Sequence, residues 1–122
     1  FLPGIAGVIR GRGTILAGPQ QHSAIEVFAL IRDSLPENAI LMFAKPRALS
    51  LYAERTALAD PVVKDMTKFH EQVTAAGVNY FLLSNKISSE ETQRYLRVMS
   101  NRVTELWSNA EFRLYRLKEL NP

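Results

Sequence analysis

The chain has 122 residues, of which 47% are hydrophobic and 22% are charged, a size and balance typical of one globular domain with a real core. The net charge is +3, but the cations are spread along the chain without a basic run, so we expect no nucleic-acid partner. The absence of cysteine excludes disulfides and thiolate chemistry.

The start of the chain differs in composition from the rest. Residues 1–19 contain all but one of the glycines, and residues 1–9 carry no charge. We interpret residues 1–19 as a membrane-proximal lead-in or linker, with at most a short strand near residues 14–16. Residues 20–122 are then a single α/β domain.

A first helix is predicted over residues 23–34. Ser23 and Glu26 have the spacing of a capping box, and Pro36 ends the helix. Its inward face would consist of Ala24, Val27, Phe28, Ile31 and Leu35.

The next segment joins a buried strand to a helix. The apolar run 39–44 predicts a strand covered on both faces. Pro46 suits the first position of a short helix over residues 48–54. Lys45 and Arg47 flank this junction, and ligands of open α/β sheets bind where strands end in this way. The alternative is a solvated basic loop.

Three further elements follow. A strand is predicted over residues 56–59, and a helix capped by Asp60 or Asp65 leads to Gly77 as its C-cap. The apolar run 78–83 predicts another strand. The inward stripe of the helix would be Val62, Met66, Phe69, Val73 and Ala76.

The C-terminal part combines a helix with a hairpin. The helix opens at Ser88 and extends to about residue 101, with Thr92, Tyr95, Leu96 and Met99 facing inward. Strands over 103–107 and 112–117 follow as an antiparallel hairpin. Trp107, Phe112 and Tyr115 are interpreted as its packing residues. The sequence thus predicts a three-layer, Rossmann-like α/β domain with a mixed sheet, in which the first and third strands are parallel and adjacent or nearly so.

The sequence contains no motif for catalysis, metal binding or cofactor binding. We therefore expect no catalytic residue, no metal and no cofactor in this chain, and we place His70 on a helix surface. The remaining polar cluster is Lys45, Arg47, Tyr52 and Arg55, which we interpret as an anion-binding or substrate-binding site. The alternative is that Arg55 pairs locally with Glu54 while Tyr52 packs on the sheet.

The order of motifs resembles a known family. IRDSLPENAILMF, KPRALSLYAER, AGVNYFLLSN and ELWSNAEFRLYRL together resemble the C-terminal domain of bacterial multi-spanning membrane glycosyltransferases. These enzymes are related to dolichyl-phosphate-mannose protein mannosyltransferases and to aminoarabinose transferases. The resemblance covers about residues 20–118.

The resemblance implies a role without catalysis in this fragment. In such enzymes the catalytic carboxylate lies in the membrane part, the donor is a polyprenyl-phosphate sugar, and this domain sits on the extracytoplasmic, periplasmic face. The parent would be a glycosyltransferase of the cell membrane. The expected partners are the transmembrane part of the parent chain and a lipid-phosphate sugar or glycan acceptor. The uncharged residues 1–9 would then leave the last membrane helix.

Two other functions stay open from the residues alone. The chain fits a stand-alone α/β protein that binds a small phosphate or other anion at Lys45 and Arg47. It also fits a protein-interaction module that works through its terminal hairpin.

Overall fold

The computed structural model describes residues 19–118, so the strand expected near residues 14–16 lies outside the part described. The elements in chain order are α1 (Pro19–Ser34), β1 (Ile40–Met42), α2 (Pro46–Ala53), β2 (Thr56–Leu58), α3 (Met66–Ala76), β3 (Tyr80–Ser84), α4 (Glu90–Val98), β4 (Val103–Ser108) and β5 (Phe112–Leu117).

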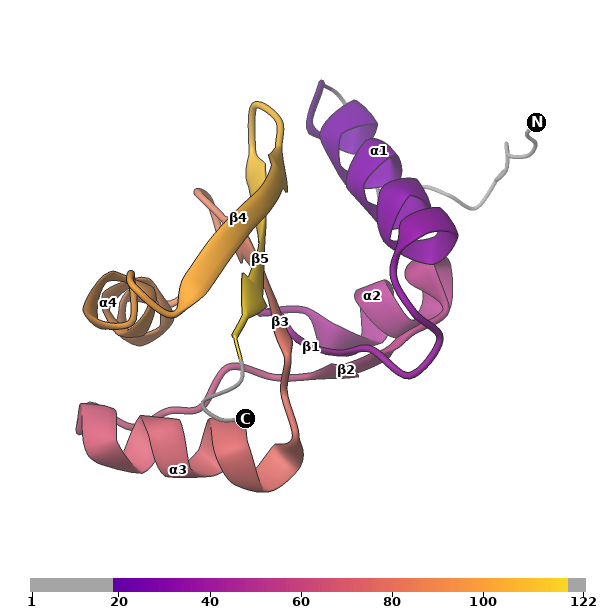
Figure 1. Cartoon of the computed structure of the whole chain (residues 1–122). Coiled ribbons are helices and arrows are strands. Elements are labelled where there is room, and N and C mark those ends of the chain that lie inside the picture. The colour runs from indigo at the N-terminus through magenta and orange to yellow at the C-terminus, as the bar shows by residue number, and fades with distance from the viewer. Residues whose placement is uncertain (1–18, 119–122) are drawn as a thin grey trace.

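The strands form one mixed sheet with the order β2-β1-β3-β5-β4 (Figure 1). β1 is parallel to both β2 and β3, while β5 is antiparallel to both β3 and β4. The parallel pairing of the first and third strands and the terminal hairpin are therefore confirmed.

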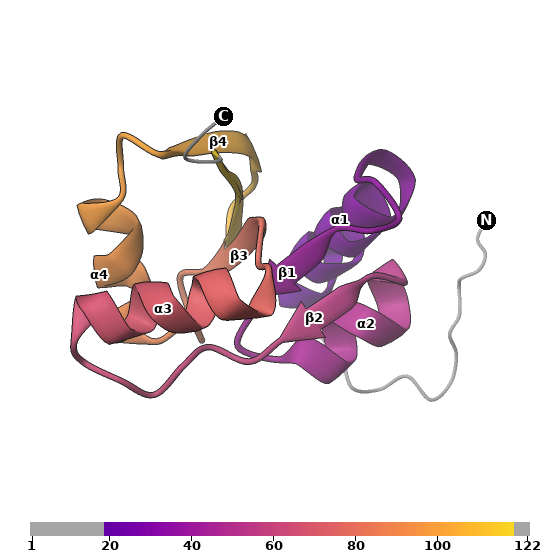
Figure 2. The same ribbon diagram turned by 60° about the horizontal axis from the view of Figure 1, so that its bottom comes forward.

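Helices cover both faces of the sheet. Figure 2 shows α1 and α2 on one side of it and α3 and α4 on the other. Leu41 and Phe43 pack in the cluster under α1 and α2, whereas Met42, between them, packs in the cluster under α3 and α4. This alternation explains why the run 39–44 is apolar throughout, and it confirms the three-layer α/β prediction.

The ends of α3 are set by local chemistry. The Asp65 carboxylate accepts a hydrogen bond from the Thr67 amide at 2.8 Å, so Asp65 rather than Asp60 caps this helix. At the other end Gly77 has a φ of 74°, the left-handed conformation predicted for it.

The first helix begins earlier than predicted. It starts at Pro19, a residue type favoured at the first helical position, so Ser23 lies inside the helix and does not cap it. The Ser23 carbonyl and the Glu26 carboxylate instead accept hydrogen bonds from the side chain of Asn109, in the hairpin turn.

The prediction that Val62 and Ala76 face inward on α3 is wrong. Val62 is 94% exposed, because it precedes the helix, which begins only at Met66. Ala76 is exposed because it is the last residue of α3, where the chain turns at Gly77.

Candidate functional site

The candidate site lies where β1 ends and α2 begins. β1 ends at Met42, and Lys45 occupies the N-cap position of α2 without a capping bond from its side chain. Lys45 and Arg47 are exposed, and neither makes an ion pair or side-chain hydrogen bond with another residue in the part described. Both cations are therefore available to a ligand.

Backbone donors add to this positive end. The first helical hydrogen bond of α2 runs from the Leu49 amide to the Lys45 carbonyl, at 3.3 Å. The amides of Arg47 and Ala48 therefore have no partner within the helix, and the helix dipole adds partial positive charge there. A shallow hollow of about 440 Å³ opens beside this end, lined by Pro46, Arg47, Ser50, Leu51 and Ala57.

The position within the sheet also suits ligand binding. β1 lies between β2 and β3, and the helices that follow β1 and β3 lie on opposite faces. This is a topological switch point, at which open α/β sheets bind ligands.

The neighbouring loop after β3 is fixed by hydrogen bonds. The Ser84 hydroxyl donates to the Glu111 carboxylate at 2.9 Å, and the Ser84 amide donates to the Ser88 hydroxyl at 2.8 Å. Ser84 is fully buried. This loop therefore gives one wall of the switch point a defined shape.

The other two predicted site residues lie at the far end of α2. The helix has eight residues and is about 12 Å long, so Tyr52 and Arg55 are separated from Lys45. The guanidinium of Arg55 donates to the carbonyls of Leu35 at 2.7 Å and Pro36 at 2.9 Å. It also donates to the carbonyls of Arg32 and Glu54.

Arg55 thus holds the end of α1, while Tyr52 contacts the body of that helix. The Tyr52 ring stacks on Phe28 with centroids 6.0 Å apart. The structure places Lys45 and Arg47 at the N-terminal end of α2 but places Tyr52 and Arg55 in contacts with α1 and the loop after it. Their binding role stays a prediction.

His70 lies in a different polar contact. Its Nδ1 is 2.7 Å from the hydroxyl of Tyr95, and His70 is partly buried rather than fully on the surface. Burial raises the pKa of Tyr95 to about 12. Within residues 19–118, no group of three His, Cys, Asp or Glu residues is arranged to hold a metal.

Asp60 is a residue whose environment the sequence did not reveal. Its Oδ2 is buried and has no hydrogen-bond partner among the residues described, and burial raises the pKa of this carboxyl. Hydrogen bonds from Thr92 and Ser89, at the start of α4, lower the pKa of this carboxyl and so offset part of the rise. No local signal identifies this contact, because α4 is distant in sequence.

The hairpin aromatics pack inside the domain, as predicted. Phe112 is buried in the cluster under α1 and α2, and Trp107 packs against the same cluster. Tyr115 packs against the opposite cluster.

Sequence comparisons give no family for this chain. No protein-family model matches it, and no curated protein does either. No helix in the described part is long and apolar enough to cross a bilayer.

The fold is similar to a domain of an oligosaccharyltransferase. The similar structure is a crystal structure of the C-terminal globular domain of the oligosaccharyltransferase from Archaeoglobus fulgidus. The TM-score is 0.51, and the match covers 84% of this chain and 99% of that one. The two sequences are 9% identical, so the likeness shows a shared fold.

Proposed function

We propose that this chain is a non-catalytic, extracytoplasmic domain of an integral membrane glycosyltransferase-like protein. In this proposal the domain helps to bind a polyprenyl-phosphate sugar for the membrane part of the same protein. The parent would be a bacterial enzyme similar to the mannosyltransferases and aminoarabinose transferases named above, with this domain on the periplasmic face.

The observation that carries the proposal is the agreement of two independent likenesses. The motif order resembles the C-terminal domain of one class of membrane sugar transferases. The fold matches nearly the whole C-terminal globular domain of an oligosaccharyltransferase, at 99% coverage of that chain. Both point to a globular domain attached to a glycosylation enzyme.

The geometry at Lys45 and Arg47 supports a role in binding the donor. A polyprenyl-phosphate sugar carries its negative charge on phosphate, which an exposed arginine, lysine and free helix amides bind well. The hollow beside Arg47 provides room next to that charge, since it has a volume of about 440 Å³.

Binding of a short polyprenyl phosphate to the 122-residue chain in neutral detergent micelles tests this role. We expect saturable amide NMR shifts at residues 45–51. The double variant Lys45→Glu/Arg47→Glu should lose them, because both cations then repel the phosphate. The matched control is Lys68→Glu/Arg97→Glu, which changes the net charge equally at exposed residues of α3 and α4.

The control variant distinguishes binding at a defined site from general attraction of the phosphate to a basic protein. Equal loss in both double variants, or shifts confined to another part of the domain, would contradict the proposed donor site. Inorganic phosphate that binds as tightly as the lipid would favour the stand-alone anion-binding function instead.

A further inference from the structure

A second hollow lies at the opposite edge of the sheet, where β3 begins and β5 ends. Its volume is about 510 Å³, within the range of roughly 300–1,000 Å³ that is usual for small-molecule sites. It is lined by Asn79, Tyr80, Arg116, Leu117 and Lys118. None of these residues belongs to the proposed donor site or to the site residues predicted from the sequence.

The strand pairing fixes the relative positions of these residues. Tyr80 and Arg116 are directly opposite each other on the antiparallel strands β3 and β5, so their side chains share a face of the sheet. The Leu117 amide donates to the Asn79 carbonyl at 3.0 Å, and the Lys118 amide donates to the Arg102 carbonyl at 2.8 Å. The backbone that carries the hollow is therefore held by the sheet.

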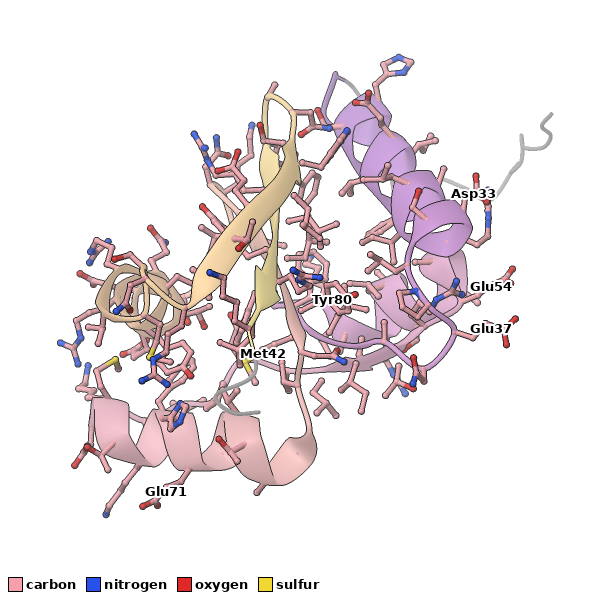
Figure 3. All side chains as sticks on the ribbon, in the orientation of Figure 1. Asp33, Glu37, Met42, Glu54, Glu71 and Tyr80 are labelled. Carbon is pink, nitrogen blue, oxygen red and sulfur yellow. The ribbon has the colours of Figure 1, made fainter. Side chains whose placement is uncertain are left out.

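The polar groups of the hollow are free to bind a ligand. Arg116 and Lys118 are exposed, and neither forms an ion pair with another residue between 19 and 118. Tyr80 is 8% exposed, and its hydroxyl makes no hydrogen bond to a side chain or backbone group of the described part. Figure 3 shows Tyr80 in the space between the hairpin and α2.

In and around the hairpin, over residues 97–118, the basic side chains outnumber the acidic ones. Between residues 97 and 118 the acidic side chains are Glu105 and Glu111. Glu105 pairs with Arg113 at 3.1 Å, and Glu111 accepts the hydrogen bond from Ser84. Beside the end of β5 the same segment contains the cations Arg102, Arg116 and Lys118. The side-chain charges at this end of the hairpin therefore favour an anion.

We propose that this hollow is a second anion site, which binds the phosphate group of a small phosphorylated ligand. The guanidinium of Arg116 matches two phosphate oxygens, and the ammonium of Lys118 adds a point charge. The Tyr80 hydroxyl donates a third hydrogen bond from the floor of the hollow.

This site is separate from the proposed donor site. Tyr80 is paired in register with Leu41, whereas Lys45 follows Leu41 by four residues toward the other edge of the sheet. At about 3.3 Å per residue, the two sites lie roughly 13 Å apart along the strand direction. A result that contradicts one of the two proposed sites therefore leaves the proposal for the other unchanged.

Titration of the 122-residue chain with inorganic pyrophosphate, followed by amide NMR, tests the second site. We expect saturable shifts at residues 79–80 and 116–118. Arg116→Gln/Lys118→Gln should weaken the affinity about tenfold or more, because two charge-assisted bonds are lost. Tyr80→Phe should weaken it by a smaller factor. The control Lys68→Gln/Arg97→Gln removes the same charges outside the hollow and should bind like the wild type.

The same variants separate a soluble phosphate ligand from a lipid headgroup. Sedimentation with vesicles of phosphatidylcholine and phosphatidylglycerol measures binding to a lipid headgroup. Weaker binding of the Arg116→Gln/Lys118→Gln variant to pyrophosphate or to these vesicles supports the site. If pyrophosphate shifts only residues 45–51, or if the control pair loses as much affinity as the hollow pair, the second site is wrong. Unchanged binding by Tyr80→Phe would remove the hydroxyl from the site but leave the two cations in it.

Discussion

At the scale of single residues, Arg55 shows how one side chain joins distant segments. Its guanidinium donates to four backbone carbonyls, three of them near the C-terminus of α1. The Arg32 carbonyl lies in the last turn of α1, where carbonyls have no partner within the helix, so a cation placed there also suits the helix dipole. Sequence spacing alone does not reveal this contact.

Replacing Arg55 by Met should therefore destabilise the domain. We expect the free energy of unfolding to fall by about 1–3 kcal/mol in urea unfolding, because four charge-assisted hydrogen bonds to backbone carbonyls are lost. Arg47→Met, at an exposed cation without such bonds, should change it by less than about 0.5 kcal/mol. Equal effects of the two substitutions would show that Arg55 does not stabilise α1.

Asp60 should give the domain a characteristic dependence on pH. Burial raises its pKa above the ordinary value of 3.8, so the folded state holds this proton more tightly than the unfolded chain does. The contribution of Asp60 to stability should consequently fall as the pH rises above 3.8, until the folded carboxyl has ionised.

The variant Asp60→Asn isolates this effect, since it removes one titrating group and leaves the others. The free energy of unfolding of the variant minus that of the wild type should grow from acidic to neutral pH. A difference that shrinks over this range would mean that Asp60 titrates with a lowered pKa.

At the scale of secondary structure, the strongest local patterns predicted the elements well. Apolar runs located β1 and β3, and Gly77 located the end of α3. The start of α1 was missed because the Ser23 and Glu26 spacing imitates a capping box, whereas Asn109 binds both residues from a distant turn. The separation of Tyr52 and Arg55 from Lys45 also depends on the length and packing of α2, which single residues do not specify.

The central strand β1 should tolerate truncation poorly. Leu41 is fully buried between the parallel neighbours β2 and β3. Leu41→Ala should lower the free energy of unfolding by about 2–5 kcal/mol. Leu51→Ala is the control, because Leu51 is 69% exposed on α2. A loss below 1 kcal/mol for Leu41→Ala, roughly the scale of an average substitution, would contradict a central buried strand.

The C-cap of α3 should distinguish backbone strain from steric clash. A Cβ at Gly77 would meet Ile40 Cδ1 at 3.6 Å, an ordinary contact, so only the φ of 74° opposes a side chain. Gly77→Ala should cost about 1–2 kcal/mol. Gly77→Asn should cost less, because asparagine adopts this conformation more readily. Equal stability of all three proteins in thermal unfolding would show that the cap is not strained.

At the scale of the whole molecule, exposed cations lie at two opposite edges of the sheet, and we propose a binding site at each. Lys45 and Arg47 lie at the carboxyl edge of the parallel strands, next to a fixed loop after β3. Arg116 and Lys118 lie at the other edge, at the end of the hairpin. The sequence allowed prediction of the first pair, because its cations directly follow an apolar run. It did not allow prediction of the second, because strand pairing brings Tyr80 and Arg116 together from distant parts of the chain.

The most direct test of the central claim is sugar transfer by the proposed membrane parent of this chain, in neutral detergent with a polyprenyl-phosphate sugar donor. The account predicts that Lys45→Glu/Arg47→Glu raises the KM for the donor about tenfold or more, with kcat little changed, because charge-assisted bonds to the phosphate are lost. Lys68→Glu/Arg97→Glu should leave both constants near their wild-type values. An unchanged KM in the Lys45 and Arg47 variant with its fold intact would contradict the account, as would sugar transfer by the isolated 122-residue chain.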